Sequence, residues 1–210
     1  MANIIPAILE SDIKEVQRKL DLLADFSEQA QLDLMDGQFV DNKSITPDEL
    51  EQIQTELNLE AHLMVKDPVS WLPYLNPDSF ILVYFHIEAV ADPAETINQI
   101  RGYGFEAGVA LNAGTPWESL ENIADYIDAV LFMGIEPGFQ GRELQPQVFE
   151  KIKRFAEKFP DPIISLDGGI NESNIFQAEE AGVSNFCVGS AIFANGDVIE
   201  NINKLKDKLT

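Results

Sequence analysis

The sequence predicts an α/β fold, namely a single (β/α)8 TIM barrel that takes in residues 1–210 as one domain. Short apolar runs recur eight times along the chain and alternate with amphipathic segments. The runs are almost continuously apolar, which is typical of parallel strands that are covered on both faces. Eight strand and helix units leave about 26 residues for each unit, which is tight but sufficient for a closed barrel of eight parallel strands.

The predicted strands are the eight apolar runs, which cover residues 4–9, 31–35, 59–65, 80–87, 107–111, 129–135, 163–166 and 186–188. An open, doubly wound sheet is the alternative, and it would place a glycine-rich phosphate turn after its first strand. The first predicted strand is instead followed by Glu10, Ser11 and Asp12, without a glycine. The barrel is therefore the preferred architecture.

Helix start signals lie between these strands. Thr46 is a suitable N-cap in front of Pro47, and two acidic residues follow in the first turn. The same pattern predicts helices over residues 172–181 and 116–124. The short segment that contains Pro73 is expected to form only one or two helical turns, because proline breaks the helical hydrogen-bond ladder.

The charge and cysteine content exclude several classes of protein. Lys and Arg number 14 against 36 Asp and Glu, which gives a formal net charge of −22. Such a chain repels nucleic acid and anionic membrane surfaces, and no apolar run reaches the roughly 18 residues of a membrane span. The lone Cys187 lies in an apolar run, so a buried thiol and a reducing, cytoplasmic location are expected. We expect neither nucleic acid nor a membrane as a partner.

Candidate catalytic residues lie at the carboxyl ends of the strands, where barrels of this type carry their active sites. Period-two alternation places Asp33 and Met35 on one face of the second strand, and His62 and Met64 on one face of the third. Asp167 ends the seventh strand. Two carboxylates and an imidazole are costly to bury unless they are paired, catalytic or bound to a metal.

Structural roles remain open for some of these side chains. Asp33 could be an acceptor for neighbouring donors, and His62 taken alone would more often be a hydrogen-bonded core histidine than a ligand. His86 is interpreted as a positioning residue. The methionines at the strand ends, Met35, Met64 and Met133, are ordinary core residues individually, but together they indicate a pliable apolar wall.

Two glycine-containing turns are typical of a phosphate site. Gly168 and Gly169 follow the seventh strand, and Gly189 and Ser190 follow the eighth. Backbone N–H groups at these positions can approach an anion closely, and barrels of this type commonly hold phosphate there. The net negative charge does not prevent this, because surface charge is screened beyond roughly 8–10 Å whereas the amides act at contact.

The segment after the sixth strand is the predicted flap. It contains Gly138, Phe139, Gln140 and Gly141, a composition that suits a mobile loop closing over substrate. An ordinary surface loop is the alternative. These four residues, the two phosphate turns, His62, Met35 and Met64 make up the predicted substrate-binding set.

The sequence resembles the ribulose-phosphate 3-epimerase family over essentially the whole chain. The segments that carry the resemblance are residues 6–9, 33–40, 62–65, 86–89, 111–112, 115–116, 133–139, 167–169 and 189–193. The resemblance implies a ribulose-phosphate-binding barrel that interconverts D-ribulose 5-phosphate and D-xylulose 5-phosphate. It also implies two catalytic aspartates, Asp33 and Asp167, and one divalent metal ion (zinc, manganese, iron or magnesium). The expected partner is a small phosphorylated sugar, and a homo-oligomer is expected.

The implied metal ligands are Asp33, His62 and Asp167. The family's remaining ligand, a histidine, is Gln31 in this chain, so Gln31 is a further candidate ligand. Ala7 replaces a serine that approaches substrate in the family. The other departures lie in the flap, at Glu136, Gln140 and Arg142.

The residues themselves support the same chemistry. Inverting a carbon next to a ketone requires proton removal from one face and proton return to the other, through an enediolate. Two carboxyl groups are suited to that task. The alternatives are an epimerase of another ketose phosphate and a phosphosugar-binding barrel without turnover.

Overall fold

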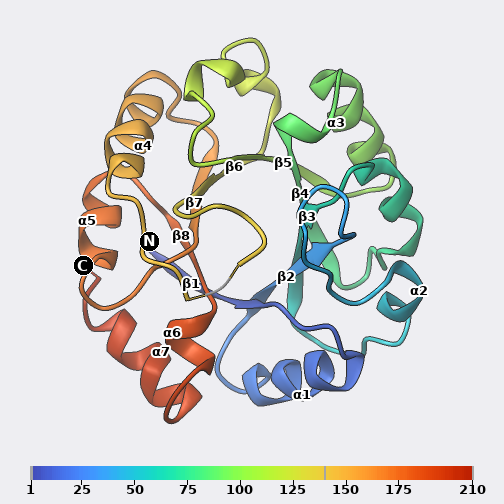
Figure 1. Cartoon of the computed structure of the whole chain (residues 1–210), viewed down its shortest axis with the longest axis vertical. Helices are drawn as coiled ribbons and strands as arrows, with labels where there is room; N and C mark the ends of the chain where they lie inside the picture. Colours follow the sequence, from blue (N-terminus) through green and yellow to red (C-terminus); the bar gives the residue numbers. More distant parts are fainter. Residues whose placement is uncertain (1, 140, 210) are drawn as a thin grey trace.

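The computed structural model describes residues 2–139 and 141–209, and it confirms the closed (β/α)8 barrel. All eight strands are parallel and follow one another around the barrel in chain order, with β8 pairing with β1 to close it (Figure 1). Their bounds are β1 (Asn3–Ile8), β2 (Gln29–Met35), β3 (Asn58–Met64), β4 (Phe80–His86), β5 (Glu106–Leu111), β6 (Ala129–Met133), β7 (Ile163–Asp167) and β8 (Asn185–Val188).

The helices surround the barrel on its outside (Figure 1). The α-helices are α1 (Ile13–Leu23), α2 (Pro47–Leu50), α3 (Pro93–Gly102), α4 (Gln147–Lys158), α5 (Ile175–Glu180), α6 (Ser190–Phe193) and α7 (Val198–Lys206). Short 3-10 helices are η1 (Pro68–Tyr74), η2 (Ile87–Ala89), η3 (Trp117–Leu120) and η4 (Ala124–Tyr126). Within the described ranges, no helix combines the length and the apolarity that a membrane crossing needs.

Two helix predictions need correction. The segment 116–124 forms the separate 3-10 turns η3 and η4 instead of a continuous α-helix, because the Thr115 hydroxyl is bonded to Glu88 and does not cap a helix. The helix predicted over 172–181 begins only at Ile175, since the Asn171 side chain first closes a local turn by accepting from Ser173 N. The short helical segment around Pro73 is confirmed as η1.

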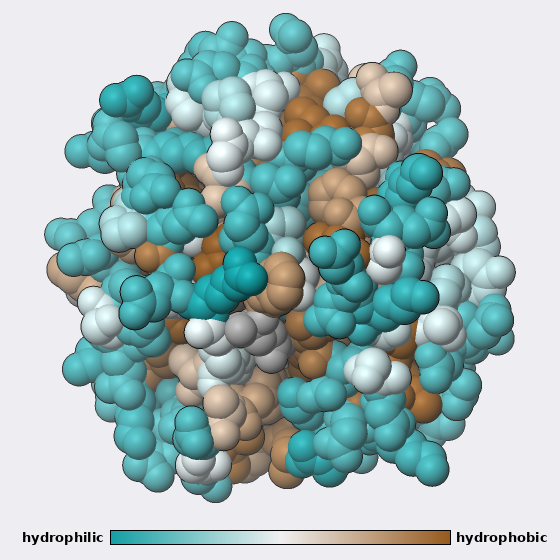
Figure 2. All heavy atoms as spheres, in the orientation of Figure 1, coloured by the Kyte–Doolittle hydropathy of each residue, from teal (hydrophilic) through white to brown (hydrophobic). Residues whose placement is uncertain are grey.

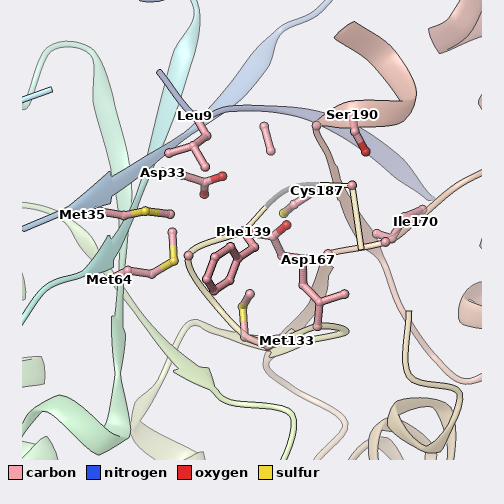
Figure 3. Close-up of a pocket in the computed structure, with 17 residues that line it drawn as sticks. Leu9, Asp33, Met35, Met64, Met133, Phe139, Asp167, Ile170, Cys187 and Ser190 are labelled. Atoms are coloured by element: carbon pink, nitrogen blue, oxygen red, sulfur yellow. The ribbon is translucent and has the colours of Figure 1, made fainter. Parts of the chain in front are cut away.

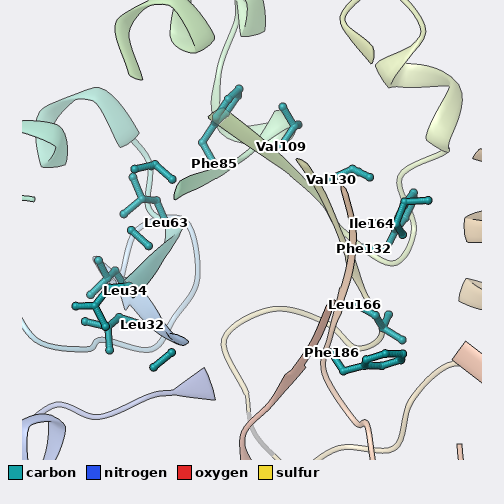
Figure 4. Packing of buried hydrophobic residues seen from close by; sticks show 14 of the residues in the cluster. Leu32, Leu34, Leu63, Phe85, Val109, Val130, Phe132, Ile164, Leu166 and Phe186 are labelled. Carbon is teal, nitrogen blue, oxygen red and sulfur yellow. The ribbon is translucent and has the colours of Figure 1, made fainter. Parts of the chain in front are cut away.

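Alternation along the strands divides the buried residues into two cores. The larger core fills the space between barrel and helices, and Figure 4 shows Leu32, Leu34 and Phe132 among its members. The smaller core lies inside the barrel and includes Cys187, which is buried as expected. Because Leu32 and Leu34 face outward, Asp33 between them faces the barrel interior. The fold thus directs polar side chains of the strands into the barrel.

The surface is strongly polar. The face drawn in Figure 2 is covered mostly by hydrophilic residues, as the net charge of −22 requires. Fourteen Lys and Arg side chains cannot neutralise 36 Asp and Glu side chains, so the net negative charge remains on the surface.

Candidate active site

A pocket opens at the carboxyl ends of the strands, and most of the predicted site residues line it (Figure 3). Those that do are Asp33, Met35, Met64, Gly138, Phe139, Gly141, Asp167, Gly168, Gly169, Gly189 and Ser190. Met133 completes the apolar wall that the three methionines were expected to form. His62 and Gln31 lie beneath the lining and are fully buried. Gln140 lies outside the described residues.

Four side chains from β2, β3 and β7 form a hydrogen-bonded cluster at the floor of the pocket. His62 Nδ1 is 3.0 Å from Asp33 Oδ1 and 3.2 Å from Asp167 Oδ2. The Gln31 amide nitrogen Nε2 donates to the same two oxygens, with both distances 2.9 Å. One oxygen of each carboxylate is therefore engaged by the cluster, while both aspartates also face the pocket (Figure 3).

The pKa values of the cluster reflect burial and mutual charge. Burial, together with the charge of Asp167, raises the pKa of Asp33 to about 6. Burial disfavours the imidazolium form of His62, but hydrogen bonds and charges from Asp167 and Asp33 outweigh this and raise its pKa to about 9. Near neutral pH the cluster thus holds a cationic imidazole between acidic groups, which compensates the cost of burying them.

Gln31 presents its nitrogen, not its oxygen, to the two carboxylates. This orientation follows from chemistry, because two carboxylate oxygens accept hydrogen bonds and repel a third oxygen. The amide oxygen, Gln31 Oε1, is buried and has no hydrogen-bond partner among the described residues. A rotation of the amide would exchange the two atoms, and such a rotation is favourable only if a cation separates Oε1 from the carboxylates.

The donor set suits a divalent metal ion. One ligand atom each from Asp33, His62 and Asp167 lie within 4.8 Å of one another, and all three residues are buried. An imidazole nitrogen with two carboxylate oxygens is a donor set that zinc, iron and manganese accept. The unpartnered Gln31 Oε1 is a further oxygen that amide rotation would bring toward the same point.

The phosphate turns have the backbone conformations that only glycine adopts easily. Gly168 and Gly169 have φ values of +100° and +74°. A Cβ atom on Gly169 would lie 2.5 Å from Leu144 N, so the flap's return segment passes directly over this turn. Gly189 and Ser190 lie on the same pocket and bring the turn after β8 to it.

The flap covers the pocket with an aromatic side chain and a cation. The Phe139 side chain is 45% exposed and projects over the pocket (Figure 3). The Arg142 guanidinium carbon lies 3.9 Å from the Phe139 ring centroid, which is a cation–π contact. Asn42 Nδ2 donates to Gly138 O at 3.3 Å and ties the flap to the loop after β2.

Two glutamates were missed in the sequence, the buried Glu60 and the more exposed Glu88. Glu60 lies two residues before His62 on the same inward face of β3, and burial followed by the charge of Glu106 raises its pKa to about 7. Strand alternation alone could have identified it. Glu88 follows β4, and the close approach of His86 together with the hydrogen bonds from Thr115 and Asn112 N outweighs partial burial and lowers its pKa to about 2. No local pattern marks Glu88, because its hydrogen-bond donors Asn112 and Thr115 come from the segment after β5.

Comparison with known proteins decides the family. The profile of the Ribulose-phosphate 3 epimerase family matches residues 3–193. The chain belongs to this family. Ribulose-phosphate 3-epimerase of Mycobacterium tuberculosis is 34% identical over 201 residues, which cover 92% of this chain and 87% of the relative. The enzyme of the same name from Bacillus subtilis is 32% identical over 98% of this chain and 99% of its own length.

The family assignment confirms the expected carbohydrate epimerase, an isomerase. The solved structure of 3-hexulose-6-phosphate synthase from Salmonella typhimurium superposes with a TM-score of 0.73 and 15% identity, and the match covers 98% of this chain and 97% of the other. That likeness concerns the barrel fold alone.

Proposed function

We propose that this epimerase-family protein interconverts D-ribulose 5-phosphate and D-xylulose 5-phosphate by proton transfer between Asp33 and Asp167. The observation that carries the proposal is that both carboxylates face one pocket while one oxygen of each is fixed by His62 and Gln31. The inversion of a carbon centre needs two proton carriers, and the pocket offers two.

Each carboxylate keeps one oxygen free of the cluster for the proton transfer. Asp33 uses Oδ1 and Asp167 uses Oδ2 to contact His62 and Gln31, which leaves Asp33 Oδ2 and Asp167 Oδ1 for the substrate carbon. In one direction Asp33 removes the proton and Asp167 returns one to the opposite face; in the other direction the roles exchange. The pKa of about 6 at Asp33 is close enough to neutrality for a group that must both accept and release a proton.

Asp33, His62 and Asp167 are the residues that would hold a divalent metal ion, with Gln31 Oε1 as a further ligand after amide rotation. When bound, the metal would supply Lewis-acid stabilisation of the charge that develops on the substrate oxygens. Met35, Met64 and Met133 keep water away from this region and thereby strengthen every electrostatic contact in it.

The opposite end of the substrate, its phosphate, is assigned to the backbone amides of Gly168, Gly169, Gly189 and Ser190. Lys and Arg are absent from the described lining, so oriented N–H groups are the donors that the lining itself provides. Closure of the flap would bring Phe139 over the sugar and keep Arg142 near the entrance. The altered rim, with Ala7 and Arg142, favours one second candidate: epimerisation of another ketose phosphate.

The test is solvent deuterium incorporation into a panel of ketose phosphates, with and without added divalent metals. We expect exchange at the carbon next to the ketone, with the largest kcat/KM for the pentulose 5-phosphates. A larger kcat/KM for a hexulose phosphate would favour the second candidate. Binding without any exchange would identify a phosphosugar-binding barrel and overturn the proposal. The expected homo-oligomer and cytoplasmic location remain predictions.

A further inference from the structure

A second histidine lies directly behind the cluster. His86, at the end of β4, has its Nε2 atom 2.9 Å from His62 Nε2. The two ring centroids are 5.1 Å apart and the ring planes differ by 24°, so the imidazoles meet through these two nitrogens. Both side chains are fully buried. Only one of the two nitrogens can carry the proton between them, and the other must accept it.

The far side of His86 shows which nitrogen carries the proton. His86 Nδ1 lies 3.4 Å from Glu88 Oε2. The two atoms are close but do not form a well-aligned hydrogen bond, because Nδ1 has no hydrogen-bond partner among the described residues. Asn112 adds a second acceptor: its Oδ1 atom is also buried and unpartnered, and it favours a proton on His86. A bare nitrogen lone pair facing a carboxylate would be repelled, so the proton belongs on Nδ1.

Glu88 is held firmly enough to impose this choice. Its Oε1 atom accepts hydrogen bonds from Asn112 N, at 2.9 Å, and from the Thr115 hydroxyl. The Lys151 ammonium group donates to Asn112 O at 2.9 Å and thereby fixes the loop from the side of α4. The carboxylate of Glu88 is therefore anchored by two donors while its other oxygen remains directed at His86.

The consequence for His62 follows by elimination. A neutral His86 with its proton on Nδ1 has an unprotonated Nε2, so the shared proton belongs to His62 Nε2. His62 then has its Nδ1 atom available toward Asp33 and Asp167. With the opposite assignment at His86, neutral His62 would carry its proton on Nδ1, and that nitrogen could not bind a metal.

We propose that Glu88 and His86 are a positioning pair that keeps a proton on His62 Nε2, so that Nδ1 is the nitrogen that gives up its proton and binds a divalent metal ion. The metal part of this inference rests on the proposed function, whereas the tautomer assignment does not. Groups that orient a metal-binding histidine typically change metal affinity by about ten- to a hundredfold when they are removed.

The chain contains two histidines, so nitrogen-15 labelling of histidine gives spectra without overlap. Long-range proton–nitrogen correlation spectra of the intact protein at neutral pH report the state of each ring nitrogen. We expect His86 with a protonated Nδ1 and a bare Nε2, and His62 with a protonated Nε2, both before and after zinc addition. Zinc should remove the proton from His62 Nδ1 alone. A protonated Nε2 on His86 in the metal-free protein would overturn the inference.

Glu88→Gln tests the origin of the tautomer, because glutamine offers His86 a donor as well as an acceptor. We expect mixed tautomers at His86 and a zinc affinity lowered by about ten- to a hundredfold. Glu180→Gln, an exposed change on α5, is the matched control and should alter neither readout. Unchanged tautomers and unchanged affinity in folded Glu88→Gln would contradict the role of Glu88. If the variant fails to fold, the wild-type spectra still decide.

The outcomes separate this inference from the proposed function. If the protein shows the expected tautomers but has no epimerase activity, the positioning pair is supported and the proposed function is contradicted. If the protein is an active epimerase but His86 carries its proton on Nε2, only the inference about the positioning pair is contradicted.

Discussion

Gln31 of β2 and Glu60 of β3 are register partners, and each has a buried side-chain oxygen without a hydrogen-bond partner among the described residues. An unsatisfied buried acceptor costs about 1–3 kcal/mol. A cation would relieve Gln31 Oε1 after amide rotation, and a proton would relieve Glu60 Oε2. These two neighbouring positions are therefore where the barrel interior should respond to metal and to pH.

Replacing Gln31 by histidine should tighten zinc binding. Wild-type Gln31 offers a neutral oxygen at most, whereas zinc favours nitrogen donors more than manganese or magnesium does. We expect the ratio of Mn²⁺ or Mg²⁺ affinity to zinc affinity to be higher in the wild type than in Gln31→His. Titration of both metal-free proteins with zinc and manganese measures this. Identical affinities and identical preference would rule out Gln31 as a ligand and leave it as a hydrogen-bond donor to Asp33 and Asp167.

Replacing Glu60 by glutamine should remove a pH-dependent loss of stability. The pKa of Glu60 is about 7 in the folded chain because of burial and then the charge of Glu106, against an ordinary value of 4.5. A raised carboxyl pKa means that the folded state binds this proton more tightly than the unfolded state does. The stability that the bound proton contributes is fully present below pH 4.5 and is lost as the pH rises through 7. The difference corresponds to about 3 kcal/mol.

Urea unfolding of wild type and Glu60→Gln at pH 5 and pH 8 measures the effect. The free energy of unfolding of Glu60→Gln, relative to that of wild type, should increase from pH 5 to pH 8. Glu180→Gln should show no such increase. Parallel pH dependence in all three proteins would show that Glu60 is not protonated when buried.

The barrel could be predicted from the sequence because its strands are buried on both faces and are therefore almost continuously apolar. Alternation within those runs also grouped Asp33 with Met35 and His62 with Met64, and three of these four side chains line the pocket. The bonding of Gln31 could not be predicted in this way, since its amide bridges residues 33 and 167, which only barrel closure brings together. The same holds for Glu88, whose donors follow β5.

Asp33→Asn and Asp167→Asn should each abolish epimerisation and leave the barrel folded. Each change keeps side-chain size and removes a proton carrier, which alone lowers the rate by about two to four orders of magnitude. Loss of a metal ligand adds to this. Solvent deuterium incorporation and kcat measure the effect, with circular dichroism as the folding control. Activity within tenfold of wild type in either variant would eliminate the assigned role of that aspartate.

A pentulose without its phosphate should be a far poorer substrate. The amides of Gly168, Gly169, Gly189 and Ser190 would have no anion to bind, and binding energy from this remote group positions the reacting carbon. We therefore expect kcat to fall as well as affinity. Steady-state kinetics with matched phosphorylated and free sugars provide the comparison. Comparable kinetics for the free pentulose would show that the phosphate site is misplaced.

The thermal stability of the protein should rise with salt concentration. A net charge of −22 on 210 residues destabilises the compact state by self-repulsion. Screening shortens the range of that repulsion from about 10 Å at 0.1 M salt to about 3 Å at 1 M. Thermal unfolding in NaCl and KCl over this range should give equal increases in Tm, because screening depends on ionic strength and not on the particular cation.

A variant with a smaller net charge tests the same explanation. It carries lysine in place of each of the exposed acidic residues Glu51, Asp161 and Glu180. Because its net charge is less negative, its Tm should be higher than that of wild type in low salt and should depend less on added salt. The two proteins should converge near 1 M, where repulsion between distant surface charges is screened in both. A wild-type Tm that stays constant or falls with salt would show that self-repulsion does not limit the stability of this barrel.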